Sequence, residues 1–281
     1  MRTLLPTAAL AALFLAGAAA AAAQETPTPP ESYVPPPPGP YEPVRRDALG
    51  TRLVNGATPY PVAARTLELL FTHRFHEAVN HGTSHDLWGL DSGADTGIGL
   101  AFGVTRHLDL SLYRSAFQED FELAGKLLFI EQAARVPFTL SLRAGADLLR
   151  RPGVADSSRP FAQLLLARRI VPGVNLLASP SWVSDTPRLK NAFNVPLGLT
   201  FPLPGKWLAE LEYVPANRDL DESRQAWHLA LSKALGGHIF EIVAGNSRAT
   251  TVDQMLGGDS AAGFQTHDVR LGFNIVRDFH F

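Results

Sequence analysis

The sequence predicts an all-β protein, a transmembrane up-and-down antiparallel β-barrel of about 12 strands. Apolar and polar residues alternate with a period of two along most of the chain, the pattern of strands that have two different faces. Short and long connections alternate between these strands. After residue 23 no apolar run approaches the roughly 20 residues of a membrane-spanning helix, so strands must make any crossing.

The first 23 residues predict a cleaved signal peptide. Arg2 supplies the positive charge, the stretch from Leu4 to Ala20 is mostly apolar, and Ala21 to Ala23 form a small-residue cleavage site. The alternative is a membrane anchor, which the short, alanine-rich core and the prolines that follow it disfavour. Loss of Arg2 changes the net charge from −2 to −3, and this charge offers no footprint for nucleic acid.

Residues 24–64 predict a proline-rich periplasmic leader. Nine of the 22 prolines lie between Pro27 and Pro43, and such a segment favours extended polyproline II over a strand ladder. Two interpretations stay open, a stiff leader or a docking ligand for a periplasmic partner. The segment from Arg45 to Pro61 could remain outside the barrel or enter its lumen as a short plug.

Residues 65–281 predict the barrel itself. Pro196 weakens one of its strands, because proline has no N–H for the ladder. The connections at 105–107, 131–137, 171–173, 202–206 and 235–237 are brief, whereas most connections at the opposite strand ends are long. Short periplasmic turns, long outer loops and periplasmic amino and carboxyl termini are typical of the outer membrane. The predicted strands are 67–72, 98–104, 108–113, 121–129, 138–148, 161–168, 174–183, 193–201, 207–213, 227–231, 240–242 and 267–281.

The chain stops on an aromatic residue within its last alternating strand. Phe279 and Phe281 extend the apolar parity to the carboxyl terminus. This resembles the closing strand of bacterial outer-membrane barrels, whose terminal aromatic residue is read by the barrel-assembly machinery. The resemblance implies that Phe279 and Phe281 are an assembly signal and that outer-membrane lipid surrounds the barrel.

Short motifs in the first half of the chain resemble a known family. They are Phe71-Thr72-His73-Arg74-Phe75, Trp88-Gly89-Leu90-Asp91, and Gly97-Ile98-Gly99-Leu100 followed by Gly103-Val104-Thr105. They are similar to an uncharacterised family of bacterial outer-membrane β-barrels, domain of unknown function 5777, over about Leu67 to Phe281. The resemblance implies the barrel and contributes no activity, substrate or catalytic residue.

The polar parity predicts a charge network in the lumen. Charged groups in a confined interior must pair or stay hydrated. One interpretation is an ion-paired filling that keeps the barrel's shape, and the other is a narrow pore whose acidic excess favours cations. The predicted network comprises Glu68, Arg74, Asp109, Glu122, Lys126, Arg143, Asp147, Glu210, Glu212, Glu241, Asp268 and Arg270.

Two further constellations carry weaker hypotheses. His76, His81 and His85 lie near aspartates in one polar segment, and imidazole with carboxylate suits zinc, copper, nickel or iron. Ser84, His85 and Asp86 are the residue types of a hydrolase, but adjacent residues of a strand face opposite ways and no GxSxG is present. The chain has no cysteine, which excludes disulfides and thiolate metal sites. No cofactor is expected.

The sequence therefore predicts a non-enzymatic outer-membrane barrel, either a small channel or a structural or binding barrel. The alternatives are a lipase-like hydrolase active at the outer rim and a metal-binding surface protein. Neither substrate nor ligand follows from the residues.

Overall fold

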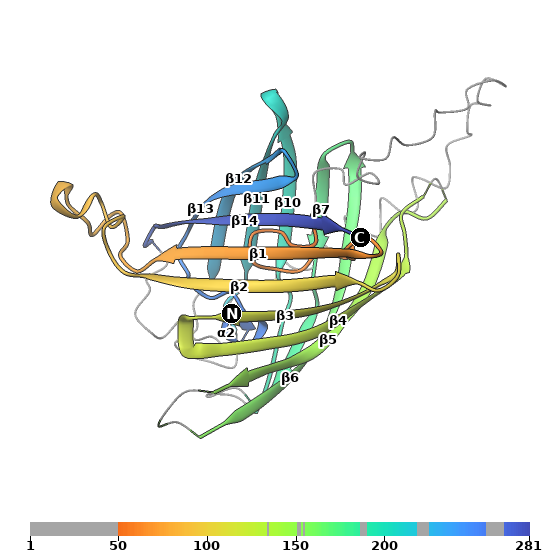
Figure 1. The fold of residues 1–281 in the computed structure, drawn as a ribbon, viewed down its shortest axis with the longest axis horizontal. Coiled ribbons are helices and arrows are strands. Elements are labelled where there is room, and N and C mark those ends of the chain that lie inside the picture. Colours follow the sequence, from red (N-terminus) through yellow and green to blue (C-terminus); the bar gives the residue numbers. More distant parts are fainter. Residues whose placement is uncertain are drawn as a thin grey trace, which may run out of the picture.

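The computed structural model describes residues 50–133, 135–150, 153, 155–185, 190–217, 225–256 and 267–281. The predicted signal peptide and most of the predicted leader, residues 1–49, lie outside the described residues. The described residues form one antiparallel sheet that closes on itself, since β1 pairs with β14 and β5 pairs with β6 (Figure 1). This confirms the predicted all-β antiparallel barrel.

The sheet contains 14 strand segments. β7 and β8 are two halves of one interrupted strand, as are β9 and β10, so the barrel has 12 strands, as predicted. No helix in the described residues is long and apolar enough to cross a membrane. The strands are β1 (Thr66–Phe75), β2 (Ala94–Gly103), β3 (Leu108–Ser115), β4 (Asp120–Ile130), β5 (Thr139–Leu149), β6 (Ser157–Val171), β7 (Val174–Ala178), β8 (Ser181–Ser184), β9 (Asn191–Asn194), β10 (Leu197–Leu203), β11 (Trp207–Val214), β12 (Ala226–Leu235), β13 (His238–Gly245) and β14 (Arg270–His280), and the helices are η1 (Ser84–Asp86), η2 (Phe117–Glu119), η3 (Pro204–Lys206) and α2 (Val252–Leu256).

Prolines mark both interruptions. Pro180 follows the end of β7, and Pro196 lies between β9 and β10, where the sequence predicts a weakened strand. Their carbonyls still accept hydrogen bonds, from Leu164 N at 2.8 Å and from Ser179 N at 2.9 Å. The missing N–H groups therefore break the ladder locally, while the wall continues past each break.

The outer face of the barrel is apolar. Along β1 the buried and partly exposed positions alternate, with Glu68, Thr72 and Arg74 on the buried side. Large apolar side chains on the other face are exposed, among them Ile98 at 56%, Leu110 at 54% and Ile242 at 62%. Lipid solvates such a face, and closure of the sheet leaves no unpaired edge in contact with it.

The two ends of the barrel differ. β1 begins and β14 finishes at one end, here called the terminal end, where Phe281 N donates to Arg65 O at 3.1 Å. Phe279 and Phe281 are 41% and 80% exposed there. The connection between β1 and β2 extends beyond the opposite end, here called the loop end (Figure 1). Two segments of chain lie inside the wall. One contributes Leu53 and Val54 to the first cluster of buried apolar side chains, and the other contributes Val252 and Leu256 to the second cluster.

Candidate functional site

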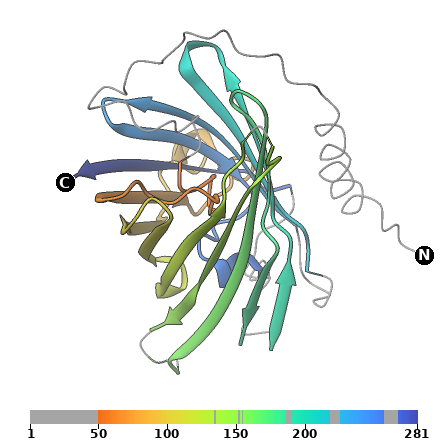
Figure 2. The ribbon, with the colours of Figure 1, turned by 90° about the vertical axis from the view of Figure 1, so that its right-hand side faces the viewer.

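Residues 50–64, here called the N-terminal plug, lie inside the barrel (Figure 2). The plug folds back on itself, because Leu53 N donates to Gly56 O and Thr58 N donates to Thr51 O, each at 2.9 Å. Of the two positions that the sequence left open for this part of the chain, the structure therefore has the one in the lumen.

Small wall residues make room for the N-terminal plug. A Cβ atom on Gly103 would lie 1.9 Å from Ala63 O, and one on Gly198 would lie 2.5 Å from Cδ2 of Leu53. Leu53 and Val54 pack in a buried apolar cluster to which β6, β7, β12 and β13 contribute small or aliphatic side chains. Small residues at several positions of the wall therefore leave room for the N-terminal plug.

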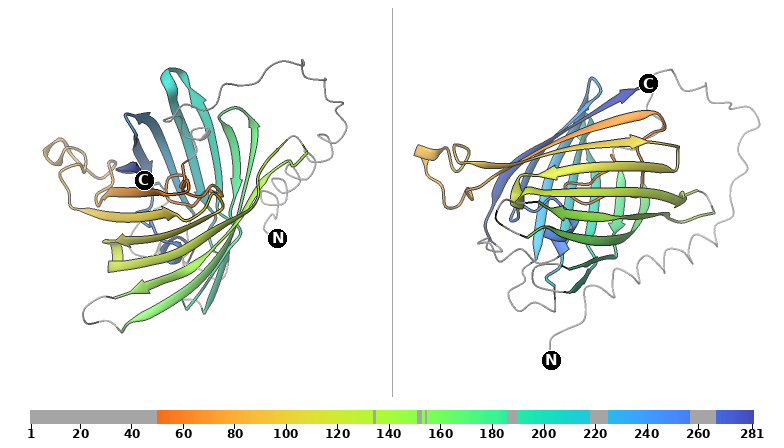
Figure 3. Two further views of the ribbon diagram at one scale, coloured as in Figure 1. Left: turned by 45° about the vertical axis from the view of Figure 1, so that its right-hand side comes forward. Right: turned by 60° about the horizontal axis from the view of Figure 1, so that its bottom comes forward.

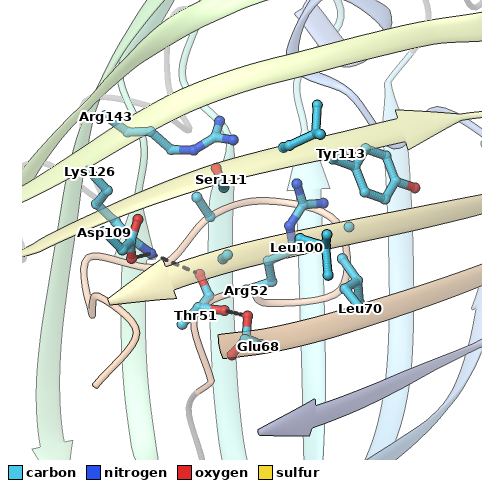
Figure 4. Close-up of a pocket in the computed structure, with 14 residues that line it drawn as sticks. Thr51, Arg52, Glu68, Leu70, Leu100, Asp109, Ser111, Tyr113, Lys126 and Arg143 are labelled. Carbon is cyan, nitrogen blue, oxygen red and sulfur yellow. Dashed lines mark hydrogen bonds and ion pairs between the residues drawn. The ribbon is translucent and has the colours of Figure 1, made fainter. Parts of the chain in front are cut away.

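A buried lysine fixes the plug near its middle. The Lys126 ammonium donates to the carbonyls of Tyr60 at 2.8 Å, Thr58 at 3.2 Å and Thr51 at 3.3 Å. Its carboxylate partner is Asp109, with Nζ 3.5 Å from Oδ2, and Asp109 also accepts from Val62 N at 2.9 Å (Figure 4). The charges of this wall ion pair therefore cancel, and both of its members bind the plug backbone: Lys126 binds carbonyl oxygens and Asp109 binds an N–H group.

The tip of the N-terminal plug reaches acidic residues of the wall. Glu212 accepts from Asn55 N at 2.9 Å and from Gly56 N at 2.7 Å. Arg74 donates to the side-chain oxygen of Asn55 at 2.8 Å. Arg52 lies 3.2 Å from Oε1 of Glu122. Several polar groups at the tip thus bind wall groups of opposite character.

Residues 246–256, here called the loop plug, fill the lumen from the loop end and include α2. Arg159 of β6 forms an ion pair with Asp253, and Asn217 Nδ2 donates to Leu256 O at 3.3 Å. Val252 and Leu256 are buried in an apolar cluster with Phe161 and other wall residues. Figure 3 shows α2 in blue within the curve of the strands.

Glu122 contacts both plugs. Its Oε1 accepts from Arg52 of the N-terminal plug and from Arg143 of β5, and its Oε2 accepts from Val252 N of the loop plug at 2.9 Å. The two plugs therefore meet at one carboxylate of the wall, on the third residue of β4. A side chain with two acceptor oxygens and a full charge suits this position, because each oxygen serves a different partner.

The cavities found between the plugs and the wall are small. Three cavities between plugs and wall measure about 40, 20 and 20 Å³. A single water molecule needs roughly 10–15 Å³ by this measure, so each cavity holds a few waters at most. The cavity of about 40 Å³ is lined by Thr51 and Arg52 of the plug and by wall residues that include Tyr113 (Figure 4).

The wall residues of the predicted charge network all lie in or beside this filled interior. Eleven of them are buried, and Arg270 has 11% of its side chain exposed at the loop end. There Arg270 pairs with Asp268 at 3.2 Å, and Asp268 also lies 2.9 Å from His81 Nε2. Nearer the terminal end of the lumen, Glu68 accepts from Thr51, Glu210 accepts from Ser232, and Glu241 accepts from Asn274.

Two of the three histidines of the metal hypothesis contact different aspartates. His76 Nε2 lies 3.2 Å from Asp95, and His81 Nε2 lies 2.9 Å from Asp268. Among the described residues, no group of three potential ligands that includes a histidine has its ligating atoms within 4.8 Å of one another. Metal binding at His76, His81 and His85 stays a prediction, without a preformed three-residue cage to support it.

Ser84, His85 and Asp86 form η1 on the exposed loop. Thr83 Oγ1 accepts from His85 N at 3.2 Å, and Asp86 Oδ1 accepts from Thr83 N at 2.7 Å, which together make a capping box. Across the part of the chain that the structure describes, no hydrogen bond joins the Ser84 hydroxyl to an imidazole. The side chains of Thr83 and Asp86 therefore act here as helix caps.

Sequence reasoning did not select several residues of the filled lumen. Asp120 shares the inward parity of Glu122 and Lys126, so an extension of that pattern by one step would have found it. Asp253, Arg52 and Arg159 carry no such signal, because the first two lie in segments without strand periodicity and the third precedes a proline at a strand end. Only the folded chain brings them together.

Comparisons with known proteins give a family and no activity. The family described as "Membrane bound beta barrel domain", domain of unknown function 5777, has a sequence model that matches residues 49–279, a range that includes both plugs. No curated protein matches the chain.

Three of the solved structures that match the chain are only weakly similar to it. Two are of outer membrane phospholipase A from Escherichia coli, each 12% identical and covering 78% of this chain and 91% of that chain, with TM-scores of 0.44 for an active-site mutant and 0.45 for the other structure. The third is CdiB from Acinetobacter baumannii, which is 8% identical and has a TM-score of 0.33. The match covers 77% of this chain and 60% of that chain. Likenesses of this degree say nothing about what the chain does.

Proposed function

Because the chain belongs to the family of membrane-bound β-barrel domains, domain of unknown function 5777, we propose that it is a non-enzymatic outer-membrane barrel that its own plugs keep closed at rest. Its role is then that of a structural or binding barrel. The observation that carries the proposal is the double use of Glu122, which holds the N-terminal plug through Arg52 and the loop plug through Val252 N.

The charges of the lumen support closure over conduction. A cation-selective pore needs acidic groups that face water, whereas Glu122 and Glu212 are each 2% exposed and bind groups of the plugs. A charge that already binds protein donors offers nothing to a passing ion. These two carboxylates of the predicted acidic excess are thus used within the chain.

Conductance in planar bilayers tests the proposal. Purified full-length protein is expected to show no steps above the blank, whereas a variant without residues 50–64 and with 246–256 replaced by a short Gly-Ser linker is expected to conduct. Heat-modifiable gel mobility checks that the variant still forms a barrel. Steady conductance of the full-length protein contradicts closure, and so does a folded double deletion that stays silent.

The orientation proposed with this role puts both termini in the periplasm and the loop end outside. The native chain has no cysteine, so single thiols can report sides without background. In intact cells an impermeant maleimide is expected to label Ser84→Cys at the loop end and to spare Arg106→Cys in the turn at the terminal end. Labelling of residue 106 without labelling of residue 84 would contradict this orientation.

A further inference from the structure

Three buried carboxylates meet where the loop plug touches the wall. Asp120 and Asp147 are 0% exposed and Asp253 is 1% exposed. Each of them has a potential ligand oxygen within 4.8 Å of the corresponding oxygens of the other two. They come from three different elements, β4, β5 and α2, so that any group bound among them would join the loop plug to the wall.

The fold, and not local sequence, creates this arrangement. Glu122 of β4 is the cross-strand partner of Asp147, and Asp120 lies two residues before Glu122 on the same inward face. α2 then carries Asp253 onto this corner, where Asp253 N donates to Oδ2 of Asp147 at 2.9 Å. Side chains at diagonal positions of neighbouring strands are within reach of a shared ligand.

Two oxygen atoms of the cluster lack a partner. Oδ1 of Asp120 and Oδ1 of Asp147 are buried and make no hydrogen bond in the described part of the chain. The remaining oxygens are used: Oδ2 of Asp120 accepts from Thr251 and Gln254, each at 3.3 Å, and Oδ1 of Asp253 accepts from Thr251 at 2.8 Å. A buried unpaired oxygen costs about 1–3 kcal/mol, and more when it is charged, so two on one cluster call for a ligand.

The charges of the cluster do not balance. When all three carboxyl groups are ionised, the pairing of Arg159 with Asp253 leaves them with a net charge of −2. The neighbouring Glu122 pairs with both Arg52 and Arg143, so the four carboxylates of this corner together face three arginines. The cluster thus keeps an excess of negative charge, which a bound cation would offset.

We propose that Asp120, Asp147 and Asp253 bind one calcium ion that fastens the loop plug to the wall. Carboxylate and hydroxyl oxygens are ligands of hard cations, and Ca²⁺ accepts up to eight of them in irregular geometry. Two ligands on opposite sides of Ca²⁺ lie at most about 5 Å apart, which accommodates the observed spread. Mg²⁺ fits less well, because it usually keeps several waters and the three carboxylates are buried.

Calorimetry on chelator-treated protein in detergent tests binding directly. Ca²⁺ is expected to give saturable heat with one site per chain, and Mg²⁺ is expected to bind at least about tenfold more weakly. Absence of saturable heat with the wild-type protein overturns the site, whatever the bilayer recordings show. Tighter binding of Mg²⁺ than of Ca²⁺ overturns the calcium assignment.

A matched pair of variants locates the ion. The double change Asp120→Asn with Asp147→Asn removes two ligand charges at nearly constant volume and is expected to weaken Ca²⁺ binding by at least about 100-fold. Glu241→Gln, a change of the same kind at a buried lumen residue that contacts Asn274, is expected to leave binding unchanged. Equal binding by both variants contradicts the proposed ligands.

A local readout separates the ion's role from closure in general. With single cysteines at Val252 of the loop plug and Val54 of the N-terminal plug, which are 6% and 1% exposed, a chelator is expected to speed maleimide labelling at residue 252 and to leave residue 54 unchanged. Equal acceleration at both sites would mean that the ion holds no particular plug and would overturn the fastening role.

Discussion

Lys126→Met isolates the contribution of the lysine that anchors the N-terminal plug. Lys126 is 4% exposed, and its ammonium donates to the carbonyls of Thr51, Thr58 and Tyr60 at 2.8–3.3 Å. Methionine has a similar length and volume, so the change removes the charge and the three donors without opening a large cavity. The lumen wall is otherwise unchanged.

The expected loss follows from these contacts. Hydrogen bonds that involve a charged group contribute about 1.5–3 kcal/mol each, and the shortest of the three is the one to Tyr60. The two longer bonds add less, and Asp109 loses its cation but keeps Val62 N. We expect the docked plug to lose about 3 kcal/mol, which corresponds to a roughly 150-fold larger population of the undocked plug.

Thiol labelling measures this population. In a Val54→Cys background the thiol replaces a side chain that is 1% exposed, so it reacts only when the plug undocks. When redocking is faster than the reaction, the labelling rate is proportional to the undocked fraction. Lys126→Met is therefore expected to label about two orders of magnitude faster.

The matched control is Lys233→Met, because the ammonium of Lys233 lies 5.0 Å from the ring centroid of Trp207 on the other face of the wall. It is expected to label at the parental rate. If Lys126→Met labels within threefold of the parent while its heat-modifiable mobility is normal, the lysine does not hold the plug and the reasoning fails.

Three further predictions follow from single contacts. Gly103→Ala puts a Cβ 1.9 Å from Ala63 O and is expected to speed labelling of the same plug thiol, whereas Gly125→Ala, whose nearest neighbour lies at 3.3 Å, should not. Phe281→Ala removes a side chain that is 80% exposed, so it is expected to reduce assembly in cells while stability after refolding in detergent stays the same; normal recovery in the outer membrane refutes the assembly role. Burial raises the pKa of Tyr60 above its usual value near 10, so the stability that this group gives to the docked plug is complete below pH 10 and is lost as the pH rises through the raised pKa. Ultraviolet titration of the wild-type protein and of Tyr60→Phe is expected to show one tyrosine of the wild type that ionises late. Identical titration curves would refute the raised pKa of Tyr60.

Local pattern alone was enough to predict the wall. Alternation fixes which face of each strand is apolar, and lipid permits no open sheet edge, so closed strands follow from the residues without knowledge of any contact. Even the weakness at Pro196 was visible, since a missing N–H is a property of one residue. The inward position of residues such as Glu68 and Lys126 follows from the same parity.

Only the tertiary structure decided what those inward residues do. The sequence could not tell whether Glu122 faces water or protein, because its partners Arg52 and Val252 lie 70 and 130 residues away in segments without periodicity. The cluster of Asp120, Asp147 and Asp253 is equally invisible, as it exists only when α2 enters the barrel. A repeating pattern reports the environment on either side of a sheet, whereas the filling of a closed space depends on which distant segments of the chain fold into it.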